Sequence, residues 1–304
     1  MAGSKISAWI YAARLRTLPL SVSGILVGSG YAVYHEQFDV IIFTLAIITT
    51  LLLQILSNFA NDYGDGVKGT DNHERIGPER AFQSGKITRR SFKNGLILTS
   101  VLSFLSATTL ILLAFGIENA FLTLGFFLLG LLAIWAAIKY TVGKSAYGYR
   151  GMGDFFVFLF FGLVSVCGSY VLYSKGIDNH IIIAGIGIGL LSTAVLNLNN
   201  MRDYFSDKNA RKNTLVVLMG QLRSKYYHSF LILAGIIFMT VFYISVGFSE
   251  WVYLSLITVL LLFKHLSFVI KNEDPKDLDQ ELKKVALSTF GIALIFFVVQ
   301  FILR

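Results

Sequence analysis

Residues 40–61 read VIIFTLAIITTLLLQILSNFAN, a stretch without a single charged side chain. A helix needs about 20 apolar residues to cross the ~30 Å hydrocarbon core of a bilayer, so this stretch is long enough to span a membrane. Further runs of the same kind follow along the chain. The sequence therefore predicts nine membrane-spanning helices, over residues 17–34, 40–61, 96–116, 120–140, 155–173, 181–198, 226–246, 252–270 and 285–303.

The composition agrees with a membrane protein. Of the 304 residues, 55% are hydrophobic and 14% are charged, whereas soluble domains have about 45–50% apolar and about 25% charged residues. A membrane barrel of strands would show alternating segments of about ten residues, which these continuous runs are not. We therefore predict an all-α integral membrane bundle. It forms a single domain over residues 1–304, with pseudo-repeat halves of roughly 1–150 and 151–304.

The basic residues predict the orientation of the bundle. If the N-terminus is cytoplasmic, 24 of the 26 Lys and Arg residues fall in inside segments, which leaves Lys175 and Arg304 outside. The net charge of +8 then reflects topology, and nucleic-acid binding becomes improbable. We expect a multi-pass protein of the cell inner (cytoplasmic) membrane. Arg14 and Arg16 interrupt the first apolar run, so we expect no removable signal peptide. The lone Cys167 excludes an internal disulfide and a cysteine-based metal site.

A first polar cluster closes the second apolar run. Asn58, Asn61, Asp62 and Asp65 are spaced by three and four, so they share one face of a helix. Carboxylate and amide oxygens suit hard cations, and magnesium is commonly held by one or two carboxylates together with substrate phosphates. We call these four residues the first carboxylate cluster and predict that they hold Mg2+.

A second cluster follows the sixth run, where Asp203 and Asp207 are again one helical turn apart. We call these two residues the second carboxylate cluster. The nearby basic residues suited to grip phosphate oxygens are Lys68, Arg75, Arg80, Arg202 and Lys212. The alternative is that both clusters are polar helix ends at the membrane surface. Two clusters on the same side, each beginning inside an apolar span, favour a functional site that faces the cytoplasm.

A glycine-rich stretch, residues 139–154, lies between the two clusters. Its glycines predict a bent loop. Lys139, Tyr140 and Tyr149 are candidates for contact with an anionic aromatic substrate, and an interfacial anchor is an equally good interpretation of the same residues. The five histidines show no metal-binding spacing, and His73 is expected to be a solvated loop residue. Residues 272–284 are expected to form a solvated loop.

These stretches resemble the UbiA superfamily of membrane prenyltransferases. The matching segments are ARLRTLPLS, LLQILSNFANDYGDGVKGTD, RIGPERAFQSGKIT, KYTVG, YGYRGMGDFFVFLFFG and AVLNLNNMRDYFSDKNARKNTLVV, spread over residues 13–217. Within the superfamily, the LLQILSN and YGYRG blocks favour the branch that prenylates 1,4-dihydroxy-2-naphthoate for menaquinone synthesis.

The resemblance implies transfer of a polyprenyl group from polyprenyl diphosphate to the naphthoate ring, with decarboxylation to demethylmenaquinone. It implies that Mg2+ is held by Asn58, Asn61, Asp62, Asp65, Asp203 and Asp207, with Asp71 a further candidate. Arg202 and Lys212 become expected diphosphate contacts. Lys139 is a candidate catalytic residue. The remaining candidates for substrate binding are Lys68, Arg75, Tyr140, Tyr149 and Asn200.

Two departures from the family pattern stand near the second cluster. Arg211 occupies a position where the family has glycine, and Leu218 and Met219 replace an Arg-Leu pair. Neither change removes a carboxylate.

Two other functions compete with the naphthoate reaction. Prenylation of 4-hydroxybenzoate or another aromatic acceptor belongs to the same class. A cation-coupled transporter belongs to a different one, but transporter sites lie near the bilayer midplane, whereas these carboxylates gather at one membrane face.

Overall fold

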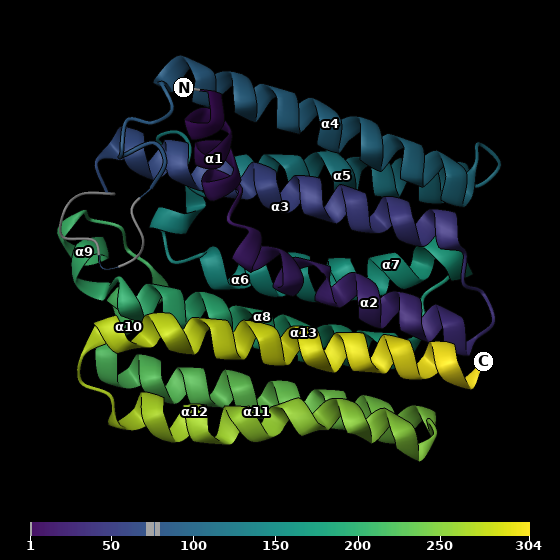
Figure 1. The fold of residues 1–304 in the computed structure, drawn as a ribbon. Coiled ribbons are helices and arrows are strands. Elements are labelled where there is room, and N and C mark those ends of the chain that lie inside the picture. Colours follow the sequence, from purple (N-terminus) through teal and green to yellow (C-terminus); the bar gives the residue numbers. More distant parts are fainter. Residues whose placement is uncertain (1, 71–75, 77–79) are drawn as a thin grey trace.

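The structure is a computed structural model and describes the chain except residues 1, 71–75 and 77–79. Figure 1 shows a bundle of long helices that run side by side. The described residues contain nine helical segments long and apolar enough to cross a membrane, which confirms the predicted fold class. The long helices are α2 (Leu18–Tyr34), α3 (Val40–Lys68), α4 (Arg89–Phe115), α5 (Ala120–Lys139), α8 (Asn179–Arg202), α11 (Gln221–Val246), α12 (Val259–Lys271) and α13 (Leu278–Leu303).

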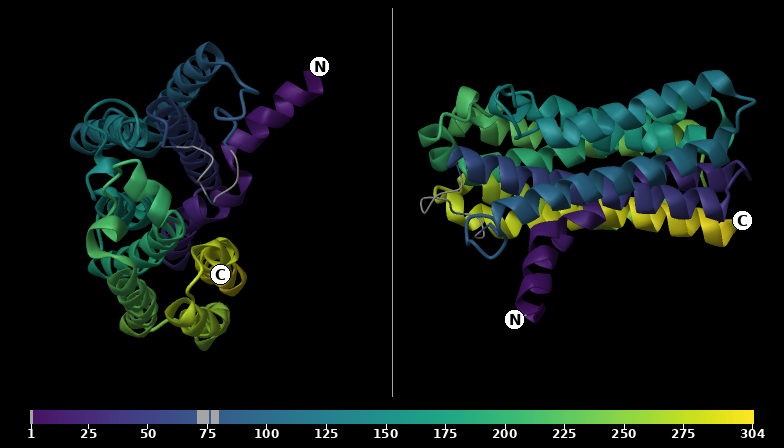
Figure 2. Two further views of the ribbon diagram at one scale, coloured as in Figure 1. Left: turned by 90° about the vertical axis from the view of Figure 1, so that its left-hand side faces the viewer. Right: turned by 90° about the horizontal axis from the view of Figure 1, so that it is seen from above.

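A short helix, α1 (Ala2–Ala13), precedes the bundle and points away from it, as the right-hand view of Figure 2 shows. The change of direction falls at Arg14, whose φ of 51° is left-handed, followed by a 3-10 turn over Leu15–Thr17. The left-hand view of Figure 2 looks along the long helices. Because α1 joins α2 at this bend, Arg14 lies at the rim of the bundle.

The fifth span is not a regular α-helix. It consists of α6 (Gly153–Val157), a π-helical segment over Phe158–Val164 and α7 (Ser165–Ser174). The irregular segment packs closely on α8, where a Cβ atom at Gly162 would lie 2.5 Å from the Gly185 carbonyl oxygen. Contacts this close require glycine, and small residues of this kind let membrane helices approach closely.

Both carboxylate clusters lie at one end of the bundle. The α3 helix continues beyond residue 61, where the sequence prediction ended, to Lys68, and so carries the whole first cluster. After α8, the chain forms α9 (Tyr204–Asn209) and α10 (Leu215–Met219) at the same end (Figure 1). The glycine-rich stretch forms the predicted bent loop there, and an isolated β-bridge joins its Arg150 to Asn213.

One sequence prediction is wrong. Residues 272–284 were expected to form a solvated loop, but α13 begins at Leu278 and buries both Leu278 and Glu281. The acidic residues in its first turn stabilise a helix start through the helix dipole. Charged residues in this segment therefore mark the beginning of a helix. The last span is longer than its apolar part, and its first turn reaches the end of the bundle that holds the clusters.

Candidate active site

The first carboxylate cluster is buried at the end of α3 although it consists of polar groups. Asp62 is 1% exposed and forms ion pairs with Arg14 and Arg80, the latter at 3.1 Å. The Asn58 amide donates to the Ala13 carbonyl oxygen at 2.8 Å and so attaches α3 to the end of α1. Buried charges need compensating partners, and the two arginines supply them for Asp62.

Lys212 joins the two clusters. Its ammonium nitrogen lies 3.6 Å from Asp65 Oδ2 and 3.6 Å from Asp207 Oδ1, and all three residues are buried. Burial by itself lowers the pKa of Lys212, but Asp65 and Asp207 outweigh it and hold that pKa well above its ordinary value. The lysine is therefore charged. It occupies the centre between carboxylates from α3 and α9.

The glycine-rich loop supplies a third side to the site. The Tyr149 hydroxyl donates to Asp65 Oδ1 at 2.8 Å and lies 2.6 Å from Thr70 Oγ1. Lys68 Nζ lies 3.7 Å from the centroid of the Tyr149 ring, in a cation–π contact. Tyr149 thus touches groups that the sequence analysis assigned to diphosphate and metal. Burial and the Asp65 charge both raise its pKa, so its hydroxyl stays protonated and donates.

The second cluster has two different environments. Asp203 is held by Arg202, whose Nε and Nη2 donate to its two carboxylate oxygens at 2.9 and 2.7 Å. Asp207 has the Lys212 contact on one oxygen, while its buried Oδ2 has no hydrogen-bond partner. Burial raises the pKa of Asp207 to about 6, and Lys212 acts in the opposite direction. A buried oxygen without a donor is a ready ligand for a cation.

Other predicted site residues have weaker links to this centre. Asn61 accepts a hydrogen bond from Thr141 at 3.3 Å, and Asn200 is buried on α8. Burial raises the pKa of Tyr140, with Lys212 acting in the opposite direction. Lys139 ends α5, and within the described chain no hydrogen bond or ion pair joins it to a carboxylate. Asp71 and Arg75, like His73, lie outside the described residues.

Two contacts of the α3 end that carries the first cluster were missed by the sequence analysis. Arg14 pairs with Asp62, although its charge was interpreted only as a topology signal. Thr141 donates to the Ala60 carbonyl oxygen at 2.8 Å and fixes the glycine-rich loop to α3. Both residues lie in segments that carry the family resemblance, ARLRTLPLS and KYTVG, and that was the available signal.

The donor set fits a divalent cation that is shared with a substrate. In the part of the chain that the structure describes, no three His, Cys, Asp or Glu side chains form a group able to hold an ion alone. Magnesium, however, is commonly bound by one or two carboxylates together with substrate phosphates. Asp207, with its orphaned oxygen, and the neighbouring Asp65 match that arrangement. The positively charged side chains around these two carboxylates are suited to bind the phosphate groups of such a substrate.

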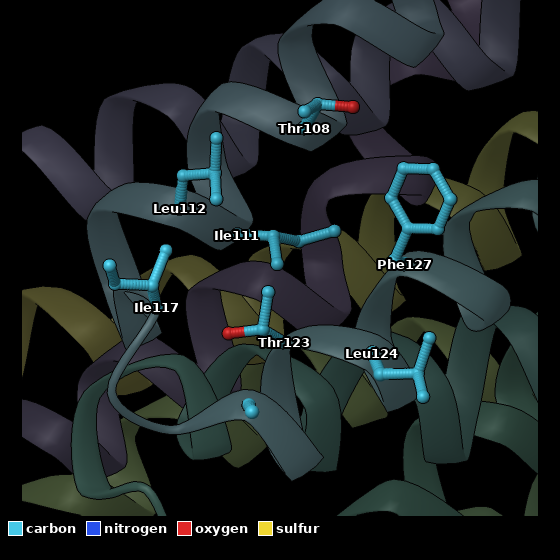
Figure 3. A pocket seen from close by; sticks show the side chains of 8 residues that line it. Thr108, Ile111, Leu112, Ile117, Thr123, Leu124 and Phe127 are labelled. Carbon is cyan, nitrogen blue, oxygen red and sulfur yellow. The ribbon is translucent and has the colours of Figure 1, made fainter.

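A separate pocket, drawn in Figure 3, lies where α4 joins α5, at the end of these helices opposite to the clusters (Figure 1). It has a volume of about 280 Å3 and is lined almost wholly by apolar side chains, including Ile111, Leu124 and Phe127. The lining offers two threonine hydroxyls and no charged group. It therefore lacks the residues that diphosphate chemistry needs.

Comparison with known proteins identifies the class. The model of the UbiA prenyltransferase family matches residues 21–298. The chain therefore belongs to the UbiA prenyltransferase family, which confirms the family predicted from the sequence.

Two relatives are similar to this chain over nearly its whole length. The 1,4-dihydroxy-2-naphthoate octaprenyltransferase of Haemophilus influenzae is 43% identical over 298 residues, which cover 97% of this chain and 96% of that one. The protein of the same name from Escherichia coli K12 is 42% identical over 293 residues, covering 96% and 94%.

Solved structures share the fold at low identity. The apo UbiA homolog of Aeropyrum pernix K1 has a TM-score of 0.70 at 14% identity, covering 95% of this chain and 98% of that one. The Archaeoglobus fulgidus UbiA homolog bound to DMAPP and Mg2+ has a TM-score of 0.65 at 15% identity, covering 96% and 99%.

Proposed function

We propose that the chain is a magnesium-dependent 1,4-dihydroxy-2-naphthoate polyprenyltransferase. The observation that carries the proposal is the convergence of both carboxylate clusters on Lys212, in a chain at least 42% identical to two proteins named 1,4-dihydroxy-2-naphthoate octaprenyltransferase. The donor is a polyprenyl diphosphate and the acceptor is the naphthoate. The product is the quinol form of demethylmenaquinone.

The charges of the site match the demands of the reaction. The bond between the allylic carbon and the diphosphate oxygen breaks, and the electron pair leaves with the diphosphate. Lys212, Lys68, Arg14 and Arg80 stabilise the negative charge that develops on the leaving group. The oxygen atoms of Asn58, Asn61, Asp62, Asp65, Asp203 and Asp207 would hold Mg2+, which would supply further charge neutralisation when bound.

The acceptor ring then attacks the allylic carbon, and a new carbon–carbon bond forms. When the attacking ring carbon is the one that bears the carboxylate, the bond from that carbon to the carboxylate breaks, carbon dioxide leaves, and the electron pair of the broken bond restores the aromatic ring. Water would react with an allylic cation, so the step needs a dry site. The buried positions of Asp62, Asp65 and Asp207 are consistent with that need. Lys139, Tyr140 and Tyr149 remain the candidates for contact with the acceptor.

The experiment is an assay of purified protein with labelled polyprenyl diphosphate, Mg2+ and either 1,4-dihydroxy-2-naphthoate or 4-hydroxybenzoate. We expect prenylation of the naphthoate. Asp62→Ala and Asp203→Ala should abolish turnover in folded protein, whereas Glu118→Gln, an exposed change at the opposite end, should not. Full activity in either aspartate variant contradicts the proposal. Prenylation of hydroxybenzoate alone assigns a different acceptor, and magnesium-dependent release of pyrophosphate separates any prenyltransferase from a transporter.

The charge distribution supports an inner-membrane location with the N-terminus and the active site facing the cytoplasm. A cysteine test suits this chain, because Cys167 is its only cysteine and is buried. In a Cys167→Ala background, Lys276→Cys should be shielded from an impermeant thiol reagent in intact cells, and Glu118→Cys should react. The reverse labelling pattern contradicts the orientation.

A further inference from the structure

The guanidinium group of Arg202, at the end of α8, is 1% exposed and has almost no donor left for a substrate. Its Nε and Nη2 bind Asp203, Nη2 also donates to Asn199 Oδ1 at 2.9 Å, and Nη1 donates to Asp279 Oδ1 at 2.5 Å. A guanidinium has five N–H donors, and four are used in these bonds. Arg202 is thus committed to protein groups, which does not favour the diphosphate contact expected from the sequence.

Asp279 comes from a part of the chain far from both clusters in sequence. It lies in the first turn of α13, the last membrane helix, which packs along α8 and α2. The end of α13 therefore reaches the second carboxylate cluster through one side chain. Asp279 is 37% exposed, whereas the guanidinium that it binds is buried.

The charges of the three residues explain why the third is needed. Arg202 and Asp203 alone form a neutral pair, and a neutral pair attracts a divalent cation weakly. With Asp279 the group carries one net negative charge. Electrostatic interactions are strong in a site shielded from water. The additional negative charge of Asp279 therefore raises the affinity for a cation beside Asp203. The same contact fixes the orientation of the guanidinium and, through its two bonds, that of the Asp203 carboxylate.

We propose that Asp279 is a positioning residue of the second carboxylate cluster. Through Arg202 it holds the Asp203 carboxylate in place and preserves the negative charge that Asp203 presents to a divalent cation bound with the diphosphate. This inference rests on the proposed function, since it assumes a cation at the two clusters.

The test compares Asp279→Asn with Asp277→Asn, a matched loss of one charge. Asp277 is exposed, lies two positions away and has no side-chain contact with Arg202. Mn2+ binding is measured in the presence of inorganic pyrophosphate, through the loss of the free-ion signal in electron paramagnetic resonance. This measurement requires no turnover. We expect the Mn2+ dissociation constant to rise about tenfold in Asp279→Asn and to stay within about twofold of the unchanged protein in Asp277→Asn.

A second pair of measurements separates positioning from a structural role. Asp279→Glu keeps the charge, so its Mn2+ affinity should stay within about threefold of the unchanged protein even if its thermal stability falls. The Mg2+ concentration for half-maximal activity should rise in Asp279→Asn, while kcat at saturating Mg2+ changes little. Unchanged Mn2+ affinity in Asp279→Asn overturns this inference and leaves the proposed function intact. Absence of Mn2+ binding in the unchanged protein overturns the metal assignment itself.

Discussion

The Tyr149 hydroxyl donates a 2.8 Å hydrogen bond to Asp65, and this bond ties the glycine-rich loop to the first carboxylate cluster. The same ring lies under the ammonium group of Lys68, at 3.7 Å from its centroid. One side chain thus orients a carboxylate with its hydroxyl and a cation with its ring.

Replacing Tyr149 should separate these two roles. Tyr149→Phe keeps the ring and loses the hydrogen bond to a charged group, which contributes about 1.5–3 kcal/mol. We expect kcat/KM for polyprenyl diphosphate to fall by a factor between about 10 and about 140, since 1.4 kcal/mol corresponds to a factor of ten. Tyr149→Ala also loses the cation–π contact and should fall further. Steady-state kinetics with purified protein measure both values, and equal losses in the two variants contradict a role for the ring.

Lys212 should have opposite effects on cation and diphosphate binding. Its ammonium group lies between Asp65 and Asp207, where it competes with a divalent cation and attracts phosphate. In Lys212→Gln we expect Mn2+ to bind more tightly without pyrophosphate, while KM for polyprenyl diphosphate rises about tenfold. Lys208→Gln is the matched control, because Lys208 is exposed on α9, four positions before Lys212. If both affinities change in the same direction, Lys212 does not have this double role.

The magnesium requirement should depend on pH. Burial raises the pKa of Asp207 to about 6, and a carboxylate must be ionised to bind a metal. As the pH falls below about 6, protons compete with the cation, so the Mg2+ concentration for half-maximal activity should rise about tenfold per pH unit. Above about 6 it should be constant. Magnesium titrations over this pH range measure the effect, and saturating Mg2+ should restore activity at the acidic end. A requirement that does not change with pH contradicts the assignment of Asp207 as a ligand.

The sequence predicted the spans and the two clusters well because their signals are local. Continuous apolar runs mark membrane helices whatever their neighbours are, and the spacing from Asn58 to Asp65 fits one helical face. The missed contacts depend on tertiary structure. Arg14 reaches Asp62, and Asp279 reaches Arg202, only because the chain brings the bend after α1 and the start of α13 to the same end of the bundle.

Residues 272–284 were predicted wrongly for a related reason. Mixed charges in a short segment between two apolar runs are typical of a solvated loop. In the structure, Glu281 is buried, because His265 of α12 binds its carboxylate at 2.6 Å. No pattern within the segment reports that partner.

This buried contact belongs to a chain of polar groups that links the last three helices. His228 of α11 and His265 of α12 approach each other through their Nε2 atoms at 2.7 Å, and His265 Nδ1 binds Glu281 of α13. All three side chains are buried. Glu281 also pairs with Lys284, but that lysine side chain is 51% exposed.

Removing Glu281 should therefore destabilise the protein more than removing Lys284. Glu281→Ala leaves the buried Nδ1 of His265 without the carboxylate that it contacts, a loss of about 1–3 kcal/mol. Lys284→Ala breaks a pair that is half in solvent, which contributes about 0–1 kcal/mol. We expect the midpoint of thermal unfolding in detergent to fall clearly in Glu281→Ala and little in Lys284→Ala. Because neither residue touches the carboxylate clusters, the Mn2+ affinity of the folded fraction should stay the same in both. Equal midpoints for the two variants would show that the buried contact does not stabilise the last three helices.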